Sequence, residues 1–280
     1  MTTSSPVVRR RRLGQELRRL RNAAGFKNGN EAATQLKWST SKLSRIEGGR
    51  TAPIPADVSR MLDLYSVEEG SEERKRLTVL TKEARKKGWW QLYSDIPYST
   101  YIGLEAEASQ LLTYEAVVPG LLQTRRYAEE INRATNLGLS EETLEQRVDV
   151  RLQRQKLLVE GSEPLEVRAV LDESALRRLV GDRDVMREQL NHLLEVAELP
   201  NVLLQVIPFS SGAHPGTLEG PFIILRFAAQ EDPDVVYVEA NSDQYPDDVQ
   251  RYELAFDNLR AAAASVPETL ALIRNMVNDL

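Results

Sequence analysis

Two short helical patterns joined by a tight turn constrain the fold of this chain more than any other feature of its sequence. The first covers Gly29–Leu36, and the second follows a capping Ser39 and would bury Leu43 and Ile46. The glycine pair Gly48–Gly49 and two prolines shortly after it end the second pattern. A short helix, a tight turn and a second short helix, both with small apolar inner sides, predict a helix-turn-helix.

The outer side of the second helix, over residues 40–47, carries side chains that can read DNA bases. In a helix-turn-helix this helix lies in the major groove and leads with its N-terminal residues. Arg45 can bind guanine in bidentate fashion, and the hydroxyls of Thr40 and Ser41 can contact either kind of base edge. These three residues are the predicted base-reading set.

The distribution of charge along the chain agrees with a polyanion partner for the N-terminal part. Residues 1–90 hold 20 Lys and Arg against 10 Asp and Glu, whereas the remaining residues hold 16 against 32. We call residues 1–90 the head and the remaining residues the body. A basic head on an acidic body suggests that the head binds a polyanion and that the body has another function. The alternative interpretation is a solvated basic face with no partner.

Further helical patterns complete the head and define its limits. We expect a flexible tail over residues 1–8, followed by a helix from Arg9 whose outer side is rich in arginine. Another helix is expected over residues 56–65, and a charged one over 69–87. The predicted domains are therefore a DNA-binding domain at 9–68, a connecting helix at 69–88 and a C-terminal regulatory and dimerisation domain at 89–280.

The body has a mixed pattern that predicts an α+β fold. Helices are expected at Tyr101–Tyr114 and over 125–136, 140–159, 246–264 and 267–278. Four apolar runs bounded by Pro, Gly and Asn predict strands, with a helix over 174–199, interrupted near Gly181, between the first two. The predicted fold is thus an all-α head followed by a mostly antiparallel sheet of about four strands covered by helices.

Composition excludes several classes of protein and site. The absence of cysteine removes disulfides and thiolate metal sites and fits a reducing cytoplasm. The two histidines lie far apart, so we expect no metal, and no motif implies a cofactor. No apolar run approaches the roughly 20 residues that span a bilayer, and no secretory signal is expected. We therefore expect a cytoplasmic, nucleoid-associated protein that does not bind membranes.

An enzyme is the least expected class. Asp172, Glu173, His214 and Glu239 can be imagined as an acid–base set, but nothing in the sequence brings them together. Exposed carboxylates are the ordinary state in an acidic domain. His214 lies in the loop-like stretch "SSGAHPG", where a solvated histidine is expected.

The head resembles the five-helix DNA-binding domain of the Xre and lambda-repressor family. The resemblance rests on "LGQELRRLRNAAG", "EAATQL" and "WSTSKLSRIEGGRTAP" and covers about residues 9–66. It implies that Arg21 pairs with Glu47 to orient the turn. The family usually has Thr-Gln at the start of its second helix, where this chain has "FKNGNEAA". The implied contacts to DNA phosphate fall on five positions: Ser39, Lys42, Arg50, Asn28 and Asn30.

The body resembles the uncharacterised C-terminal domain of WhiJ-like, antitoxin-like regulators from actinomycetes. Six stretches carry this resemblance in order, among them "GWWQLYSDIPYSTYIGLEAEAS", "VVPGLLQTRRYA" and "NVLLQVIPFSSGAHPGTLEGPFIIL". It implies a transcriptional regulator paired with a small acidic protein encoded nearby. Arg151, Arg154 and Gln155 are the candidates for gripping such a partner, although a solvated face is an open alternative.

The sequence thus predicts a homodimeric, sequence-specific regulator of transcription that binds double-stranded DNA. Dimerisation is expected because one reading helix touches only a few base pairs. Two alternatives stay open for the body. It can be a sensor that binds a small molecule, or an antitoxin-like module that binds the neighbouring small protein.

Overall fold

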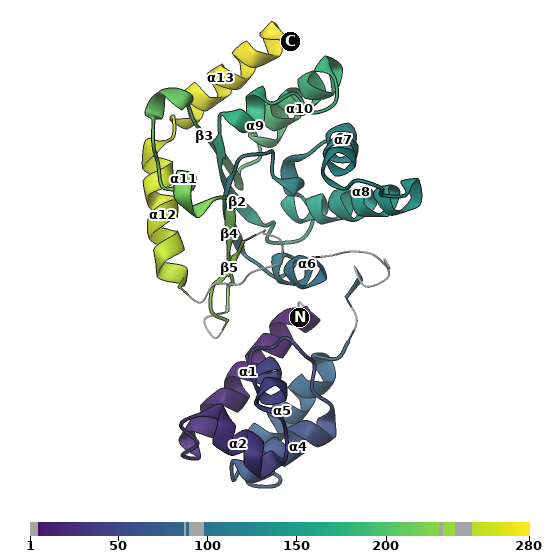
Figure 1. The fold of residues 1–280 in the computed structure, drawn as a ribbon, viewed down its shortest axis with the longest axis vertical. Helices are drawn as coiled ribbons and strands as arrows, with labels where there is room; N and C mark the ends of the chain where they lie inside the picture. Colours follow the sequence, from purple (N-terminus) through teal and green to yellow (C-terminus); the bar gives the residue numbers. More distant parts are fainter. Residues whose placement is uncertain (1–4, 87, 90–97, 230–231, 239–247) are drawn as a thin grey trace. The chain divides into compact units, whose positions relative to one another are not determined.

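The computed structural model describes residues 5–86, 88–89, 98–229, 232–238 and 248–280 (Figure 1). The chain divides into two compact units. The N-terminal unit comprises Met1–Leu92, Ser99–Glu107 and Ala229–Asp232, and the C-terminal unit comprises Tyr93–Tyr98, Ala108–Ala228 and Pro233–Leu280. Each unit has a hydrophobic core of its own.

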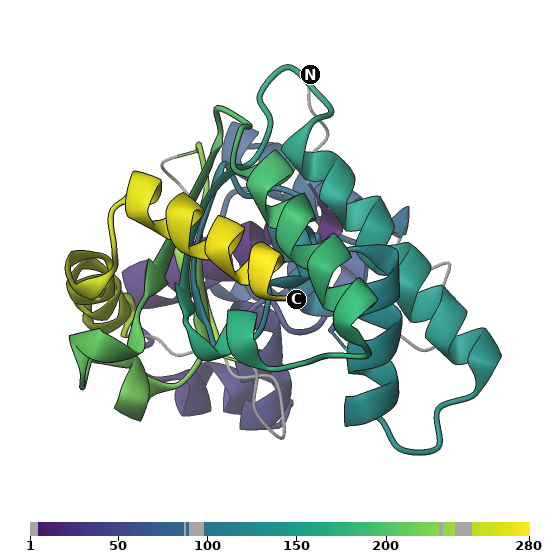
Figure 2. The same cartoon turned by 90° about the horizontal axis from the view of Figure 1, so that it is seen from above.

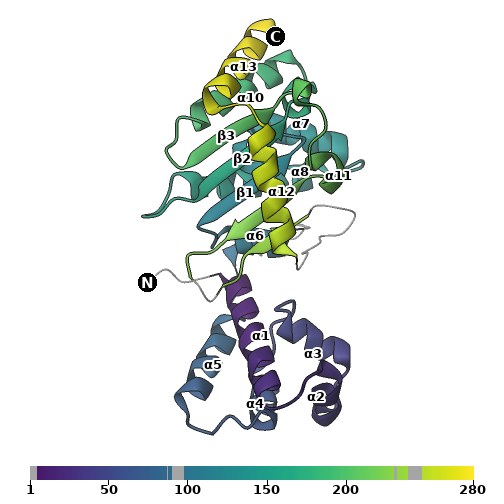
Figure 3. The same cartoon turned by 90° about the vertical axis from the view of Figure 1, so that its left-hand side faces the viewer.

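The described part of the N-terminal unit is helical. Its helices are α1 (Pro6–Ala23), α2 (Gly29–Leu36), α3 (Thr40–Glu47), α4 (Pro55–Leu64), α5 (Glu72–Glu83) and α6 (Ser99–Glu105). Figure 3 shows α2 and α3 on one side of α1 and α5 on the other. Leu17, Leu43, Met61 and Leu77 are at most 1% exposed and belong to one core. The short helices α2 and α3 are confirmed at their predicted positions.

The beginning of α1 corrects the prediction of a tail over residues 1–8. Ser5 caps the helix by accepting a hydrogen bond from the Val7 amide at 3.2 Å, and Pro6 occupies the first helical turn. Val7 and Val8 are 2% and 4% exposed. The tail prediction was wrong for residues 5–8, because burial of the two valines extends the helix toward the N-terminus. Residues 1–4 lie outside the described residues.

The helix predicted over 69–87 is shorter and belongs to the packed part of the N-terminal unit. It spans Glu72–Glu83 and is capped by Ser71, whose hydroxyl accepts a hydrogen bond from the Arg74 amide. Leu77, and Ala84 at the end of the helix, are fully buried in the same core as α1 and α4.

A mixed five-stranded sheet forms the centre of the C-terminal unit. Its strands are β1 (Gln110–Glu115), β2 (Glu166–Asp172), β3 (Val202–Ile207), β4 (Phe222–Arg226) and β5 (Val235–Tyr237), in the order β3-β2-β1-β4-β5. The β1–β2 and β2–β3 pairs are parallel, whereas the β1–β4 and β4–β5 pairs are antiparallel. The predicted α+β class is confirmed. The expectation of a mostly antiparallel sheet of about four strands was wrong.

The strand that was not predicted is β1, the central strand of the sheet, because its residues were assigned to a helix. The segment predicted as a helix at Tyr101–Tyr114 splits into α6 and β1. Leu111, Leu112, Thr113 and Tyr114 are all buried, so β1 is covered on both faces. A short apolar run of this kind has no period that separates a buried strand from a buried helix.

Helices cover both faces of the sheet. One side carries α7 (Arg125–Thr135), α8 (Glu141–Gln155), α9 (Ser174–Arg177) and α10 (Arg183–Val196), and the other carries α12 (Val249–Ala262), as Figures 1 and 2 show. The short α11 (Gly216–Glu219) precedes β4, and α13 (Val266–Asp279) packs on β3 and α10. The predicted interruption near Gly181 is confirmed between α9 and α10. Single 3₁₀ turns lie at Gly120–Leu122, Lys156–Leu158 and Phe209–Ser211.

Candidate nucleic-acid interface

The turn between α2 and α3 is built from local backbone preferences. Lys37 ends α2 in the left-handed conformation, with φ 58° and ψ 41°. The Ser39 hydroxyl then accepts a hydrogen bond from the Lys42 amide at 3.2 Å, which satisfies one of the free amides at the start of α3. Leu43 and Ile46 are 1% and 2% exposed, so the opposite side of α3 faces outward.

Two glycines allow α1 to lie directly against the end of α3: Gly49, which the sequence predicted only as part of a helix stop, and Gly14, for which it predicted nothing. A Cβ on Gly14 of α1 would sit 2.5 Å from the Glu47 carbonyl oxygen and 2.6 Å from that of Ile46. A Cβ on Gly49 would sit 2.7 Å from the Cα of Arg11, at a backbone φ of +67°. Such close backbone packing fixes the position of α3 on α1. Gly14 lies inside an otherwise strong helical pattern, and this was the sequence signal that could have indicated the close packing.

A buried ion pair ties the same two helices together. Arg21 donates from Nε to Glu47 Oε1 at 2.7 Å and from Nη2 to Oε2 at 3.1 Å, and both residues are 6% exposed. Arg21 also donates to the Phe26 carbonyl at 2.6 Å. The hydrogen bonds that Arg21 donates to the Glu47 carboxylate raise the pKa of the Arg21 guanidinium above its usual value. The structure therefore brings together the two residues that the family resemblance implied as a pair.

The predicted base-reading side chains all lie on the exposed side of α3. Thr40, Ser41 and Arg45 are exposed. Among the described residues, Ser41 and Arg45 form no side-chain hydrogen bond or ion pair. Thr40 donates from its hydroxyl to Asn30 Oδ1 at 2.9 Å, so a residue of α2 sets the direction of this hydroxyl.

The two asparagines considered for phosphate binding have different local tasks. Asn28 caps α2 by accepting a hydrogen bond from the Glu31 amide at 3.2 Å, and its own amide donates to the Glu31 carboxylate. Asn30 instead bridges to Thr40 across the turn and is exposed at the start of α2. Asn30 thus lies beside the reading side chains, whereas Asn28 is used to begin its helix.

Lys42 and Arg50 also differ, although both were predicted to bind phosphate. The Lys42 ammonium lies 2.8 Å from Asp57 Oδ2 and 3.9 Å from the centre of the Trp38 ring. Its charge is therefore partly neutralised within the unit. Arg50 is exposed and forms no ion pair among the described residues.

The residues predicted to grip a partner protein hold a loop inside the C-terminal unit. Gln155 donates to the carbonyls of Gly120 and Gln123 at 3.2 and 2.6 Å, and Arg151 donates to the Gln123 side chain. Arg154 is 6% exposed. These positions do not favour the partner-binding interpretation, because the polar groups stabilise the "PGLLQ" turn instead.

Part of the imagined acid–base set does come together. His214 Nε2 lies 3.5 Å from Asp172 Oδ2, and the His214 side chain is only 8% exposed. The expectation of a solvated loop histidine was therefore wrong. Glu173 is buried and accepts hydrogen bonds from Arg177 Nε and the Phe209 amide, both at 2.6 Å. Glu239 lies outside the described residues.

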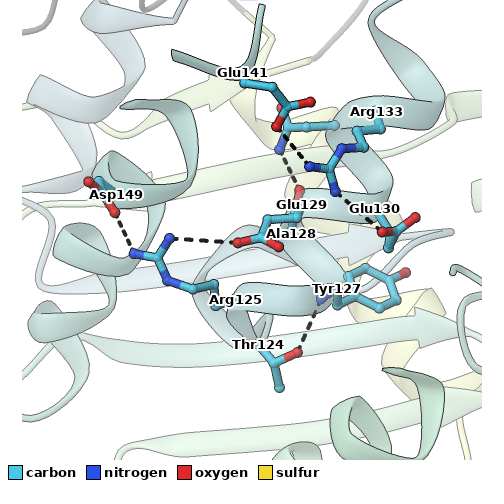
Figure 4. A network of polar contacts seen from close by, with 10 residues as sticks. Thr124, Arg125, Tyr127, Ala128, Glu129, Glu130, Arg133, Glu141 and Asp149 are labelled. Atoms are coloured by element: carbon cyan, nitrogen blue, oxygen red, sulfur yellow. Dashed lines mark hydrogen bonds and ion pairs between the residues drawn. The ribbon is translucent and has the colours of Figure 1, made fainter. Parts of the chain in front are cut away.

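Arginines on α7 of the C-terminal unit contrast with Arg45 on α3. Figure 4 shows Arg125 between Asp149 and Glu129, and Arg133 between Glu141 and Glu130. The hydrogen bond that Arg125 donates to the Asp149 carboxylate raises the pKa of Arg125 above its usual value. The side chains are about half exposed, but their charges are balanced by carboxylates.

The described residues contain neither a metal site nor a membrane-spanning helix. No group of three or more His, Asp or Glu side chains there is arranged to hold a metal ion. No helix in the same part of the chain is long and apolar enough to cross a membrane.

Comparison with protein families assigns the larger part of the chain. A family model described as a domain of unknown function (DUF5753) matches residues 98–275, which is more than half of the sequence. The chain belongs to the DUF5753 family. In this DUF5753 chain, the matched region begins just before α6 and ends within α13.

A second family model, described as a helix-turn-helix domain, matches residues 12–77 of the DUF5753 chain. The match includes α2, the turn and α3, and it indicates a DNA-binding regulator. A search of curated proteins finds no match, and a search of solved structures finds none.

Proposed function

We propose that this protein is a sequence-specific regulator of transcription that reads the DNA major groove with α3. The observation that carries the proposal is that α3 has one buried side and one exposed side. Leu43 and Ile46 are buried and Glu47 is bound by Arg21, while Ser41 and Arg45 project outward without a partner among the described residues. An exposed, unpaired arginine beside hydroxyls is the chemistry that direct reading of bases requires.

The side chains of the interface have separate roles in this proposal. Arg45 binds guanine through its two terminal nitrogens, and Ser41 and Thr40 contact neighbouring bases. Asn30 positions the Thr40 hydroxyl, because the two side chains are joined at 2.9 Å. The free amides at the start of α3 and the Arg50 guanidinium contact phosphate.

Lys42 can contact phosphate only if its ammonium leaves Asp57. Its ammonium is held by Asp57 at 2.8 Å, so a phosphate must compete with a carboxylate for it. The contribution of Lys42 to DNA affinity is therefore smaller than that of an unpaired lysine.

We further propose that the protein binds DNA as a homodimer. One helix of eight residues reads only a few base pairs, and two copies on half-sites about one helical turn apart multiply the specificity. The resemblance to WhiJ-like regulators concerns a different partner. The small acidic partner protein implied by the same resemblance stays a prediction.

Selection of bound duplexes from a random library by the full-length protein tests the proposal. The expected result is an enriched motif with two half-sites. Arg45→Ala should weaken discrimination at one base pair of each half-site by about 1–3 kcal/mol. Arg85→Ala is the matched control, since Arg85 is exposed, belongs to the same unit and has no ion pair among the described residues.

Two outcomes contradict the proposal in different ways. If no sequence is enriched, the protein is not a sequence-specific DNA-binding protein. If a motif is enriched but Arg45→Ala and Arg85→Ala change it equally little, α3 is not the reading helix.

A further inference from the structure

The carboxyl ends of the parallel strands in the C-terminal unit gather polar and aromatic side chains that DNA binding does not use. Tyr114 lies near the end of β1, and Asp172 is the last residue of β2. His214 comes from the segment between β3 and β4 and lies 3.5 Å from Asp172. In open α/β sheets, ligands bind outside the carboxyl ends of the strands, at the point where the strand order reverses. Here β2 and β3 lie on one side of β1, and β4 and β5 lie on the other. The pairing also changes from parallel to antiparallel at β1.

His214 has an unsatisfied hydrogen-bonding atom in this cluster. Its side chain is 8% exposed, and its Nδ1 atom is buried without a partner among the described residues. Because Nε2 faces the Asp172 carboxylate, the ring proton belongs on Nε2 and Nδ1 is an acceptor. A buried acceptor without a donor costs free energy, and native proteins usually satisfy such atoms.

The orientation of Asp172 is fixed by the backbone. Its Oδ1 atom accepts a hydrogen bond from the Ser174 amide at 2.8 Å, which leaves Oδ2 on the side of His214. The neighbouring Glu173 carboxylate holds the Phe209 amide at 2.6 Å and so anchors the start of the segment that carries His214.

Aromatic rings form the wall of the cluster. The Tyr114 ring meets the His214 ring edge-on at 5.6 Å and the Phe222 ring at 6.4 Å, and Phe222 in turn meets Tyr252 at 5.1 Å. A Cβ on Gly216 would lie 2.3 Å from the Tyr114 ring, so only glycine lets α11 pass over it.

The electrostatic surroundings are negative. Burial and then the charges of Asp172 and Glu115 raise the pKa of Tyr114 to about 12, so the phenol stays neutral at physiological pH. Carboxylates, an imidazole acceptor and aromatic rings together form a set that accepts protons and attracts cations.

We propose that this cluster binds a small molecule through a protonated amine. The ammonium donates to His214 Nδ1, which Asp172 at the opposite ring nitrogen keeps as an acceptor, and its carbon chain lies against Tyr114. Because Nδ1 is enclosed, the ligand enters when the segment that carries His214 moves away from β2. Gly212 and Gly220, at φ +71° and +68°, flank the residues that must move.

The chain offers an internal control for this proposal. It has two histidines, and the other one, His192 on α10, also faces a carboxylate, with Nδ1 3.7 Å from Glu195 Oε2. The Glu195 side chain is 77% exposed, so this second pair has the same groups without the enclosed, aromatic surroundings.

Nuclear magnetic resonance of the full-length protein labelled with ¹⁵N-histidine tests the proposal without DNA. The probe is n-butylamine, and 1-butanol is the neutral compound of the same shape. We expect the amine, and not the alcohol, to shift the His214 signals in a saturable manner while the His192 signals stay in place. Asp172→Asn should weaken this binding roughly tenfold or more, and Glu195→Gln should leave it unchanged.

Several results would overturn the proposal. These are a His214 response that is absent, does not saturate, is equal for the alcohol, or is matched at His192. Full binding by Asp172→Asn, with the His192 signals showing a folded protein, would also exclude it. The proposal does not depend on DNA binding, since the assay contains no DNA and reports only on the C-terminal unit.

Discussion

Arginines are used in opposite ways in the two units of this protein. On α3 of the N-terminal unit, Arg45 is exposed and forms no ion pair among the described residues, and Arg50 just after the helix is the same. On α7 of the C-terminal unit, Arg125 and Arg126 are also exposed, yet each lies within 4 Å of two carboxylates. Exposure alone therefore does not tell which arginines can bind a polyanion.

The cause of this difference is the local balance of charge. Carboxylates outnumber basic residues two to one after residue 90, so an arginine there readily finds a partner. In the first 90 residues the ratio is reversed. The acidic side chains present are concentrated on contacts within the unit, such as Glu47 with Arg21 and Asp57 with Lys42. Unpaired positive charge is left at α3.

The largest effect is expected at Arg21, a buried arginine of α1. Arg21→Met leaves the Glu47 carboxylate 6% exposed and without its bidentate partner, so we expect a loss of about 3–5 kcal/mol in the free energy of unfolding. Urea unfolding, with hydrogen exchange of the α1 and α3 amides to localise the change, measures it. The double variant Arg21→Met, Glu47→Leu should recover most of the loss. If the single variant is as stable as the parent, the pair does not brace α3.

A smaller effect is expected where the backbones of α1 and α3 meet. Gly14→Ala places a methyl group 2.5 Å from the Glu47 carbonyl oxygen, and such overpacking costs about 1–3 kcal/mol. DNA affinity should fall as well, because α3 must shift. Gly29→Ala is the control, since its Cβ would lie 3.6 Å from Leu43, an ordinary contact. Equal stability of the two variants would show that the close approach is not needed.

Asp57→Asn should make the N-terminal unit a stronger polyanion binder. Removing the carboxylate frees Lys42 for one more phosphate, so the slope of log affinity against log salt should steepen by about 0.9 for each copy bound. Fluorescence anisotropy with a random duplex at several salt concentrations measures the slope. Asp63→Asn removes an exposed carboxylate paired with Arg74 and serves as the control. An unchanged slope would mean that Lys42 does not face DNA.

The smallest effect is expected on α7. Arg125→Met removes an exposed ion pair with Asp149, which stabilises the protein by about 0.2–1 kcal/mol. DNA affinity should not change, since this charge is already balanced. Thermal unfolding and the same anisotropy assay check both parts. A clear fall in DNA affinity would place α7 at the nucleic acid and remove the distinction between the units.

Sequence patterns predicted the N-terminal unit better than the C-terminal one. The start of α3 followed from the cap Ser39 and its end from the pair Gly48–Gly49, which act on their own neighbours in the chain. The strand β1 was misread as a helix because its buried residues have no alternation. The burial of His214 was missed for a related reason, since it depends on β2 and α11 packing around a glycine-rich segment.

By itself, the sequence determined the helix-turn-helix, the outward side of α3 and the separation of a basic head from an acidic body. These features follow from caps, glycine stops and side-chain periodicity, all of which act over a few residues. Only the tertiary structure decided that Lys42 is held by Asp57, that Gly14 meets the end of α3, and that His214 is enclosed beside Asp172. Each of these contacts joins residues at least 15 positions apart, and their pairing depends on how whole elements pack.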